Sequence, residues 1–109
     1  MVTKKEAEEK ISQLQLIEQS VQTLLVQKQQ LQAQQQEIES ALDELSKTDK
    51  AYKIVGNLMI ASDKEELKKY LQTKKDTLDL RVKSIEKQEN QLKEKAESTR
   101  SQIMEGLKK

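Results

Sequence analysis

The apolar residues of this chain of 109 residues recur every seven positions along two long stretches. The first stretch runs from about residue 4 to 46 and contains no Gly or Pro. Seven-residue spacing held over several heptads predicts a helix that packs in a coiled coil. One seam position holds Ala7, Leu14, Val21, Lys28, Gln35 and Leu42, and the other holds Lys10, Ile17, Leu24, Leu31, Ile38 and Leu45.

The second stretch has the same repeat and predicts a helix over 62–107. Its start is expected at Ser62-Asp63-Lys64-Glu65, a sequence typical of a capping box in which Ser62 and Glu65 satisfy each other's free amides. One seam position holds Leu71, Leu78, Ile85, Leu92 and Thr99, and the other holds Lys75, Val82, Glu89, Ala96 and Ile103.

The two predicted helices can pair as an antiparallel coiled coil in one register. When Leu42 faces Leu71, every following layer has at least one apolar member, with Leu31 facing Val82. Lys28 and Glu89 then fall in adjacent layers, where they can form an ion pair. Such polar seam residues either penalise slipped registers or are tolerated defects, and both interpretations stay open.

Between the helices the apolar spacing changes from helical to extended. The residues from 52 to 60 read Tyr-Lys-Ile-Val-Gly-Asn-Leu-Met-Ile, and the Gly-Asn pair separates two short aliphatic runs. This pattern predicts a β-hairpin over 51–61, with Gly56 at the position of a type II′ turn that needs positive φ.

The expected strand pairs are Val55 with Leu58, Ile54 with Met59, and Lys53 with Ile60, so both faces of the hairpin carry apolar residues. A lone two-stranded hairpin is only marginally stable in water and leaves two strand edges without hydrogen-bond partners. We therefore expect other chains to complete this sheet.

The other end of the helix pair is expected to pack loosely. Its layers, Leu14–Thr99, Lys10–Ile103 and Ala7–Gly106, bury little, and several apolar residues lie outside or at the end of the seam. Ordinary fraying of helix ends and a binding surface are both compatible with this pattern. The residues of the expected binding surface are Ile11, Leu14, Leu16, Ile103, Met104 and Leu107.

Composition narrows the function further. The chain is 36% charged with a net charge of +1, so no basic excess favours nucleic acid. It has no His and no Cys, which excludes metal sites with nitrogen or sulfur ligands and nucleophiles of the Ser-His or Cys-His type. We expect no catalysis, no cofactor and no metal. The Gln-rich tract 27–36 keeps the heptad and is interpreted as a solvated helix face.

No apolar run is long enough for a membrane span, and the sequence Met1-Val2-Thr3-Lys4-Lys5 has no signal-peptide core. A cytoplasmic location is therefore expected.

The order helix, hairpin, helix resembles the prefoldin beta subunits of archaeal type. The resemblance rests on the hairpin pattern Tyr-Lys-x-Val-Gly-x-Leu-x-Ile, which lies near the midpoint of the chain. The heptads on both sides extend the similarity over almost the whole length as a single domain, 1–109. The matching residues are Tyr52, Lys53, Val55, Gly56, Leu58 and Ile60.

The resemblance implies a mainly α fold, an antiparallel two-helix coiled coil whose hairpin joins a β-barrel formed between chains. It implies a heterohexamer of two alpha and four beta subunits. It also implies an ATP-independent chaperone that holds unfolded proteins at its helix tips and delivers them to a group II chaperonin. The alternative function is a structural scaffold or tether that holds no client.

Overall fold

The structure is a computed structural model that describes residues 3–56 and 58–108. The side chains of Val55, Leu107 and Lys108 lie outside the described part. The expectations for the Leu107 side chain and for Asn57 therefore fall outside it too.

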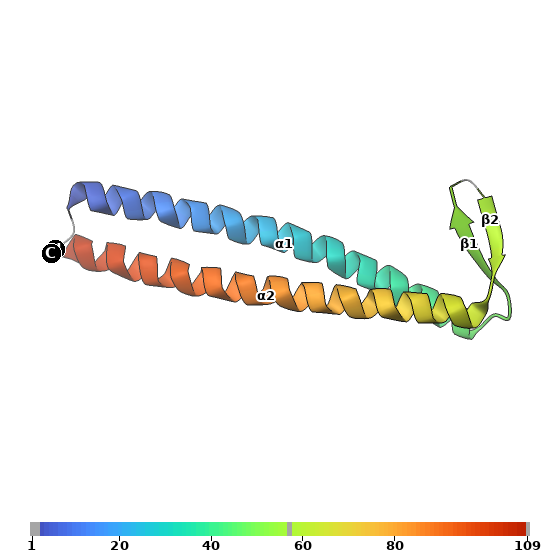
Figure 1. Cartoon of the computed structure of the whole chain (residues 1–109). Coiled ribbons are helices and arrows are strands. Elements are labelled where there is room, and N and C mark those ends of the chain that lie inside the picture. Colours follow the sequence, from blue (N-terminus) through green and yellow to red (C-terminus); the bar gives the residue numbers. More distant parts are fainter. Residues whose placement is uncertain (1–2, 57, 109) are drawn as a thin grey trace. The chain divides into compact units, whose positions relative to one another are not determined.

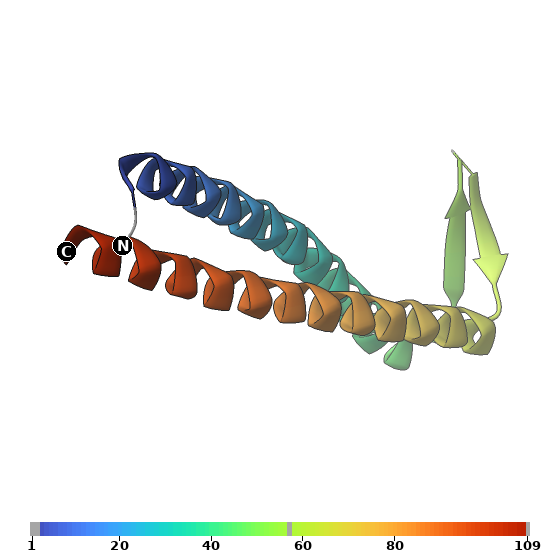
Figure 2. The same cartoon turned by 60° about the vertical axis from the view of Figure 1, so that its left-hand side comes forward.

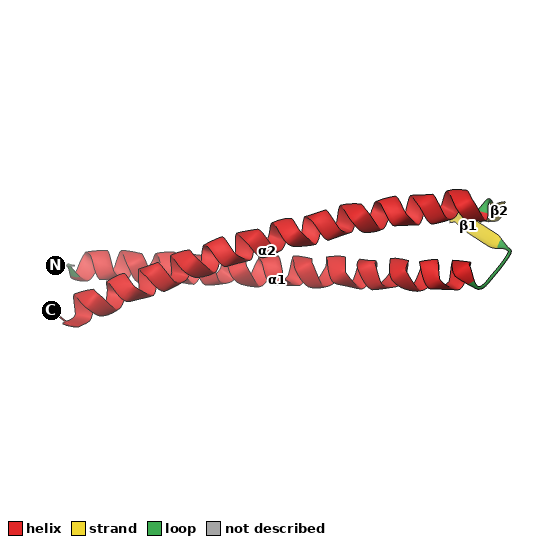
Figure 3. Cartoon of the chain, turned by 90° about the horizontal axis from the view of Figure 1, so that it is seen from below, coloured by secondary structure: helices red, strands yellow, loops and turns green. Residues whose placement is uncertain are grey.

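The chain forms two long helices with a hairpin between them, as the sequence predicts. The elements are α1 (Lys4–Ser46), β1 (Ala51–Val55), β2 (Leu58–Ser62) and α2 (Lys64–Lys108). They divide into two compact units, one made of residues 1–29 and 83–109 and the other of residues 30–82. Within each unit the segments of α1 and α2 lie side by side (Figures 1 and 3).

In the first unit the helix segments are antiparallel and bury the predicted seam. Ile17 and Ala96, which were expected to share a layer, are 7% and 5% exposed. Arg100 Nη2 lies 3.0 Å from Glu18 Oε1, which ties the two segments along one flank of the seam. These contacts fit the predicted register.

The second unit contains the rest of both helices and the hairpin. Its seam residues are among the most buried in the described part of the chain, namely Leu31, Ile38, Leu45, Leu78 and Val82. Gln35 donates a 2.7 Å hydrogen bond to Asp79, and Lys75 lies 3.5 Å from Glu39. The polar seam residues of this unit therefore find partners on the facing helix.

The start of α2 differs from the prediction. Ser62 belongs to β2 and pairs with Ala51, so its backbone is already committed to the sheet. The helix begins at Lys64, two residues after the predicted start, and Asp63 is its N-cap. Asp63 Oδ1 accepts a 2.9 Å hydrogen bond from the Glu65 amide. The proposed capping box between Ser62 and Glu65 is wrong for this reason.

The helix α1 begins with a cap that the sequence analysis did not identify. The Thr3 hydroxyl accepts a 3.1 Å hydrogen bond from the Glu6 amide, and the Thr3 carbonyl accepts one from Ala7 at 2.9 Å. The Thr3 side chain thereby satisfies the Glu6 amide, which has no backbone partner within the helix.

Candidate functional site

Two regions of the chain were predicted to carry function, the hairpin and the free end of the helix pair. The hairpin has the predicted register: Lys53 pairs with Ile60, Ile54 with Met59, and Val55 with Leu58. Gly56 has a φ of +61°, as a tight hairpin turn requires. Types I′ and II′ share a positive φ at this position, so the choice of type II′ stays a prediction.

One face of the hairpin turns toward the start of α2. On this face Ala51 is only 6% exposed, and Lys53 Nζ lies 5.8 Å from the centroid of the Tyr70 ring. At that distance the ammonium group and the ring form a cation–π contact. Figure 2 shows β1 and β2 projecting from the N-terminal end of α2 within the second unit.

The other apolar residues of the hairpin lack cover in the described part of the chain. Ile54, Met59 and Leu58 are 69%, 68% and 68% exposed, and Tyr52 and Ile60 are about half exposed. Exposed apolar clusters of this kind mark surfaces that bind other proteins. The two-stranded sheet thus offers both apolar side chains and free strand edges.

The seam of the first unit contains an ion pair between a buried carboxylate and a partly exposed lysine. Lys28 Nζ lies 2.8 Å from Glu89 Oε1, and the Glu89 side chain is only 5% exposed. The hydrogen bond to Glu89 raises the pKa of Lys28 above its ordinary value, opposed by desolvation. The predicted pairing of these two residues is confirmed.

The expected binding residues at the free end fall into two groups. Ile11, Leu16 and Met104 are exposed by 43%, 62% and 56%. Leu14 and Ile103 are half-buried in the seam and offer less surface than expected. The difference arises because both occupy seam positions, which turn toward the facing helix.

The layer of Leu14 and Thr99 is also better packed than predicted. Thr99 is 7% exposed, and its hydroxyl donates a 2.8 Å hydrogen bond to the Lys95 carbonyl. Satisfying the hydroxyl within the helix lets this polar side chain occupy a buried layer. The expectation that this layer buries little is therefore wrong for Thr99.

A groove beside the seam was not predicted from the sequence. It has a volume of about 500 Å³ and lies in the first unit. A heptad assignment classifies Leu16 as an outside position, but it does not show that the residue borders a hollow. The lining includes Leu16, Gln19, Thr23, Leu24, Gln88 and Leu92.

In the described ranges, 3–56 and 58–108, neither helix carries an apolar stretch that could cross a membrane. The same residues contain no group of three or more carboxylates placed to hold a metal ion.

Comparisons with known proteins agree with the architecture. The sequence matches the family profile described as "Prefoldin subunit" over residues 8–109. It is 41% identical to the prefoldin subunit beta of Methanosarcina acetivorans over 100 residues, which covers 89% of this chain and 86% of the relative. It is 35% identical to that of Archaeoglobus fulgidus over 96 residues, covering 85% and 83%.

A solved structure shows the same fold. The prefoldin beta subunit from Thermococcus strain KS-1 superposes with a TM-score of 0.91 at 29% identity, covering 100% of this chain and 97% of that one. The chain therefore belongs to the prefoldin subunit family, in its beta class, and is a chaperone subunit that assembles with other prefoldin subunits.

Proposed function

We propose that the chain is a subunit of an ATP-independent holding chaperone. In this proposal two alpha and four beta subunits join through their hairpins in β-barrels, and the free helix ends hold unfolded proteins. The complex then delivers these clients to a group II chaperonin in the cytoplasm.

The observation that carries the proposal is the exposure of large apolar side chains in two separate segments. In the hairpin, Ile54 and Met59 are exposed by more than two thirds, which supports burial against other subunits. Near the helix ends, Ile11, Leu16 and Met104 expose roughly half of their surface. This second set favours the holding function over a scaffold without clients.

The composition supports holding without nucleotide hydrolysis. The only two glycines, Gly56 and Gly106, are far apart in the sequence and cannot form a phosphate-binding loop. Weak apolar contacts at several helix ends would then supply affinity through avidity. Met suits such a surface because its flexible side chain adapts to different partners.

The test is to trim the helix ends of this subunit in a complex assembled with an alpha subunit. Removal of residues 1–12 and 101–109 should abolish suppression of client aggregation in light scattering. Native mass should still correspond to a hexamer, reduced only by the deleted residues, because the hairpin residues remain. Full suppression by the trimmed complex would place client binding elsewhere, and failure of the untrimmed complex to hold any client would favour the scaffold.

A further inference from the structure

We propose that the uncharged outer face of α1 between Ile11 and Gln27 binds extended, uncharged segments of unfolded polypeptide. This inference rests on the proposed holding function and names the chemistry that the subunit selects in its clients. It extends the binding surface from the helix end onto the flank of the helix, where it adds affinity for clients held at the ends but does not hold them alone.

The first observation is a local absence of charge. The chain is 36% charged, which would place about six charged residues among the 17 from Ile11 to Gln27. Only one is present, Glu18, and Arg100 of α2 lies 3.0 Å from it. This segment therefore offers a surface in which the one charge is already paired.

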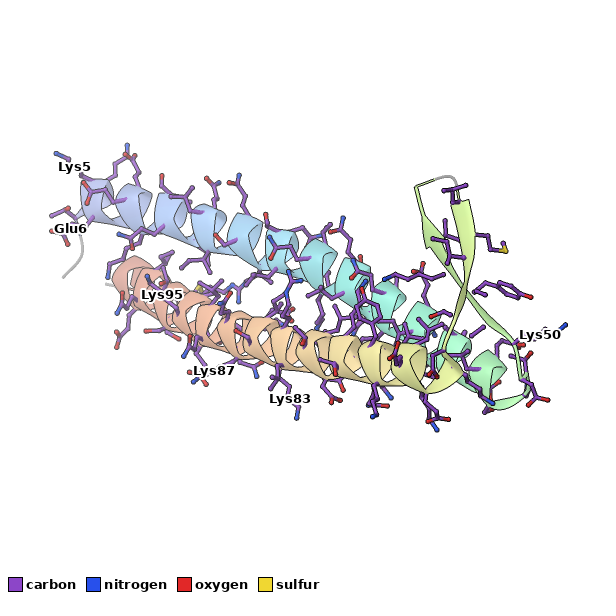
Figure 4. All side chains as sticks on the ribbon, turned by 45° about the vertical axis from the view of Figure 1, so that its right-hand side comes forward. Lys5, Glu6, Lys50, Lys83, Lys87 and Lys95 are labelled. Carbon is purple, nitrogen blue, oxygen red and sulfur yellow. The ribbon has the colours of Figure 1, made fainter. Side chains whose placement is uncertain are left out.

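The facing part of α2 has the opposite character. From residue 86 to residue 102, the stretch that faces residues 11–27 in this register, it carries eight charged residues among 17. Figure 4 shows Lys83 and Lys87 projecting from α2 on the side away from α1. Within the same unit, one helix thus presents an uncharged face and the other a charged one.

The second observation is a continuous exposed stripe on α1. Ser12, Leu16, Gln19, Thr23 and Val26 are spaced by three or four residues and so share one side of the helix. All five are exposed, with Leu16 at 62% and Val26 at 48%. The Thr23 hydroxyl donates to the Gln19 carbonyl at 3.1 Å, which satisfies this group within the helix.

Two hollows border this stripe. The groove of about 500 Å³ described above runs from Leu16 toward Leu92. A second, of about 640 Å³, is lined by Gln15, Glu18, Gln19 and Gln22. Gln19 belongs to both hollows, so one side chain connects the groove that contains Leu16, Leu24 and Leu92 with a surface rich in amide groups.

The chemistry of the stripe indicates which ligand it binds. A Gln side chain carries a carbonyl acceptor and an amide donor, the same groups as a peptide bond. The Gln side chains of the stripe can therefore bind the exposed backbone of a client whatever its sequence. Leu16 and Val26 contact the apolar side chains of that client. A charged client residue would lose hydration here without gaining a partner. The 16 steps from Ile11 to Gln27 span about 24 Å at 1.5 Å each, enough for about seven extended residues.

The experiment uses the assembled complex and a fluorescein-labelled peptide made only of Leu, Ser and Gly. The variant Gln19→Glu/Thr23→Glu places two charges in the stripe. The matched control, Gln91→Glu/Ser98→Glu, places two charges at exposed positions of α2 in the same unit. We expect the first variant to bind the peptide about tenfold more weakly, because charges there must be desolvated, and the control to change binding by less than about twofold.

A second readout is photo-crosslinking from benzoylphenylalanine at position 19 or 91, which should capture the peptide only from position 19. Equal weakening by both variants would overturn the inference, as would unchanged binding or crosslinking from position 91 alone. Dissociation of the complex in the stripe variant alone, measured by native mass, would also overturn the inference, since the face would then be a subunit contact. If the stripe variant binds the peptide as tightly as the wild type, this inference is refuted. The holding function still stands if the wild-type complex suppresses client aggregation.

Discussion

The helix seam and the hairpin contain the same kinds of aliphatic side chain but differ in burial. Ile38 and Leu78 of the seam are 6% and 3% exposed, whereas Ile54 and Met59 of the hairpin are 69% and 68% exposed. In the seam, each apolar residue meets a partner from the other helix of the same chain. The hairpin consists of two strands only, and most of its apolar surface has no such partner within the described residues.

The difference separates two sources of stability. The stability of the helix seam comes from folding of the single chain, because the apolar surface of the seam is removed from water within the subunit. Within the described residues little covers the apolar side chains of the hairpin, so we expect another chain to remove them from water. Substitutions in the seam should therefore affect subunit stability, and substitutions in the hairpin should affect assembly.

The largest effect is expected from a charge in the hairpin. Ile54→Lys or Ile60→Lys should dissociate the complex, because a buried unpaired ammonium group is costly in a multichain sheet. Helicity measured by circular dichroism should largely remain. Leu80→Lys is the control, since Leu80 is an exposed residue of α2. Sedimentation that shows an intact complex for both hairpin variants would contradict the proposed assembly role.

The next effect is expected in the seam. Leu78→Ala should lower the free energy of unfolding by about 2–5 kcal/mol, through lost burial and a residual cavity. Its control, Leu80→Ala, lies two residues away and is 68% exposed, so it should change stability by less than about 0.5 kcal/mol. Urea unfolding at a fixed protein concentration measures both. Equal destabilisation would show that the seam does not dominate subunit stability.

A smaller effect is expected at the hairpin turn. Apart from its two neighbours in the chain, a Cβ at Gly56 would meet no atom of the described residues within 4 Å, so the cost of a side chain comes from its φ of +61°. Gly56→Val should cost about 1–3 kcal/mol of local stability and weaken assembly. Gly56→Asn should be milder, because Asn tolerates the left-handed region. Assembly titrations that rank the two variants in the reverse order would contradict a backbone origin.

The smallest effect concerns the pH dependence of the seam. The raised pKa of Lys28 means that its pairing with Glu89 contributes fully below the ordinary lysine pKa and is lost as pH rises through the raised value. The stability gap between wild type and Lys28→Gln should therefore narrow at strongly alkaline pH. Lys47→Gln is the control, because its ion pair with Asp43 is exposed and contributes little. A gap that widens with pH would contradict this sign.

Much of the fold follows from local sequence patterns. The heptads predict the two helices and their seam because seven-residue spacing keeps one apolar face on the partner. The Gly-Asn pair predicts the hairpin and its register because the turn determines which residues face each other. The pairing of Lys28 with Glu89 also follows, since the seam leaves each of them one partner of opposite charge nearby.

Other features depend on contacts between segments that are distant in the sequence. Asp63 rather than Ser62 caps α2 because Ser62 is bonded to Ala51 in the sheet, which a local capping pattern does not include. The half-burial of Ile103 and the groove beside Leu16 depend on the depth to which facing side chains pack. Periodicity determines which side of a helix a residue occupies, but only the packed structure determines how much of that residue stays exposed.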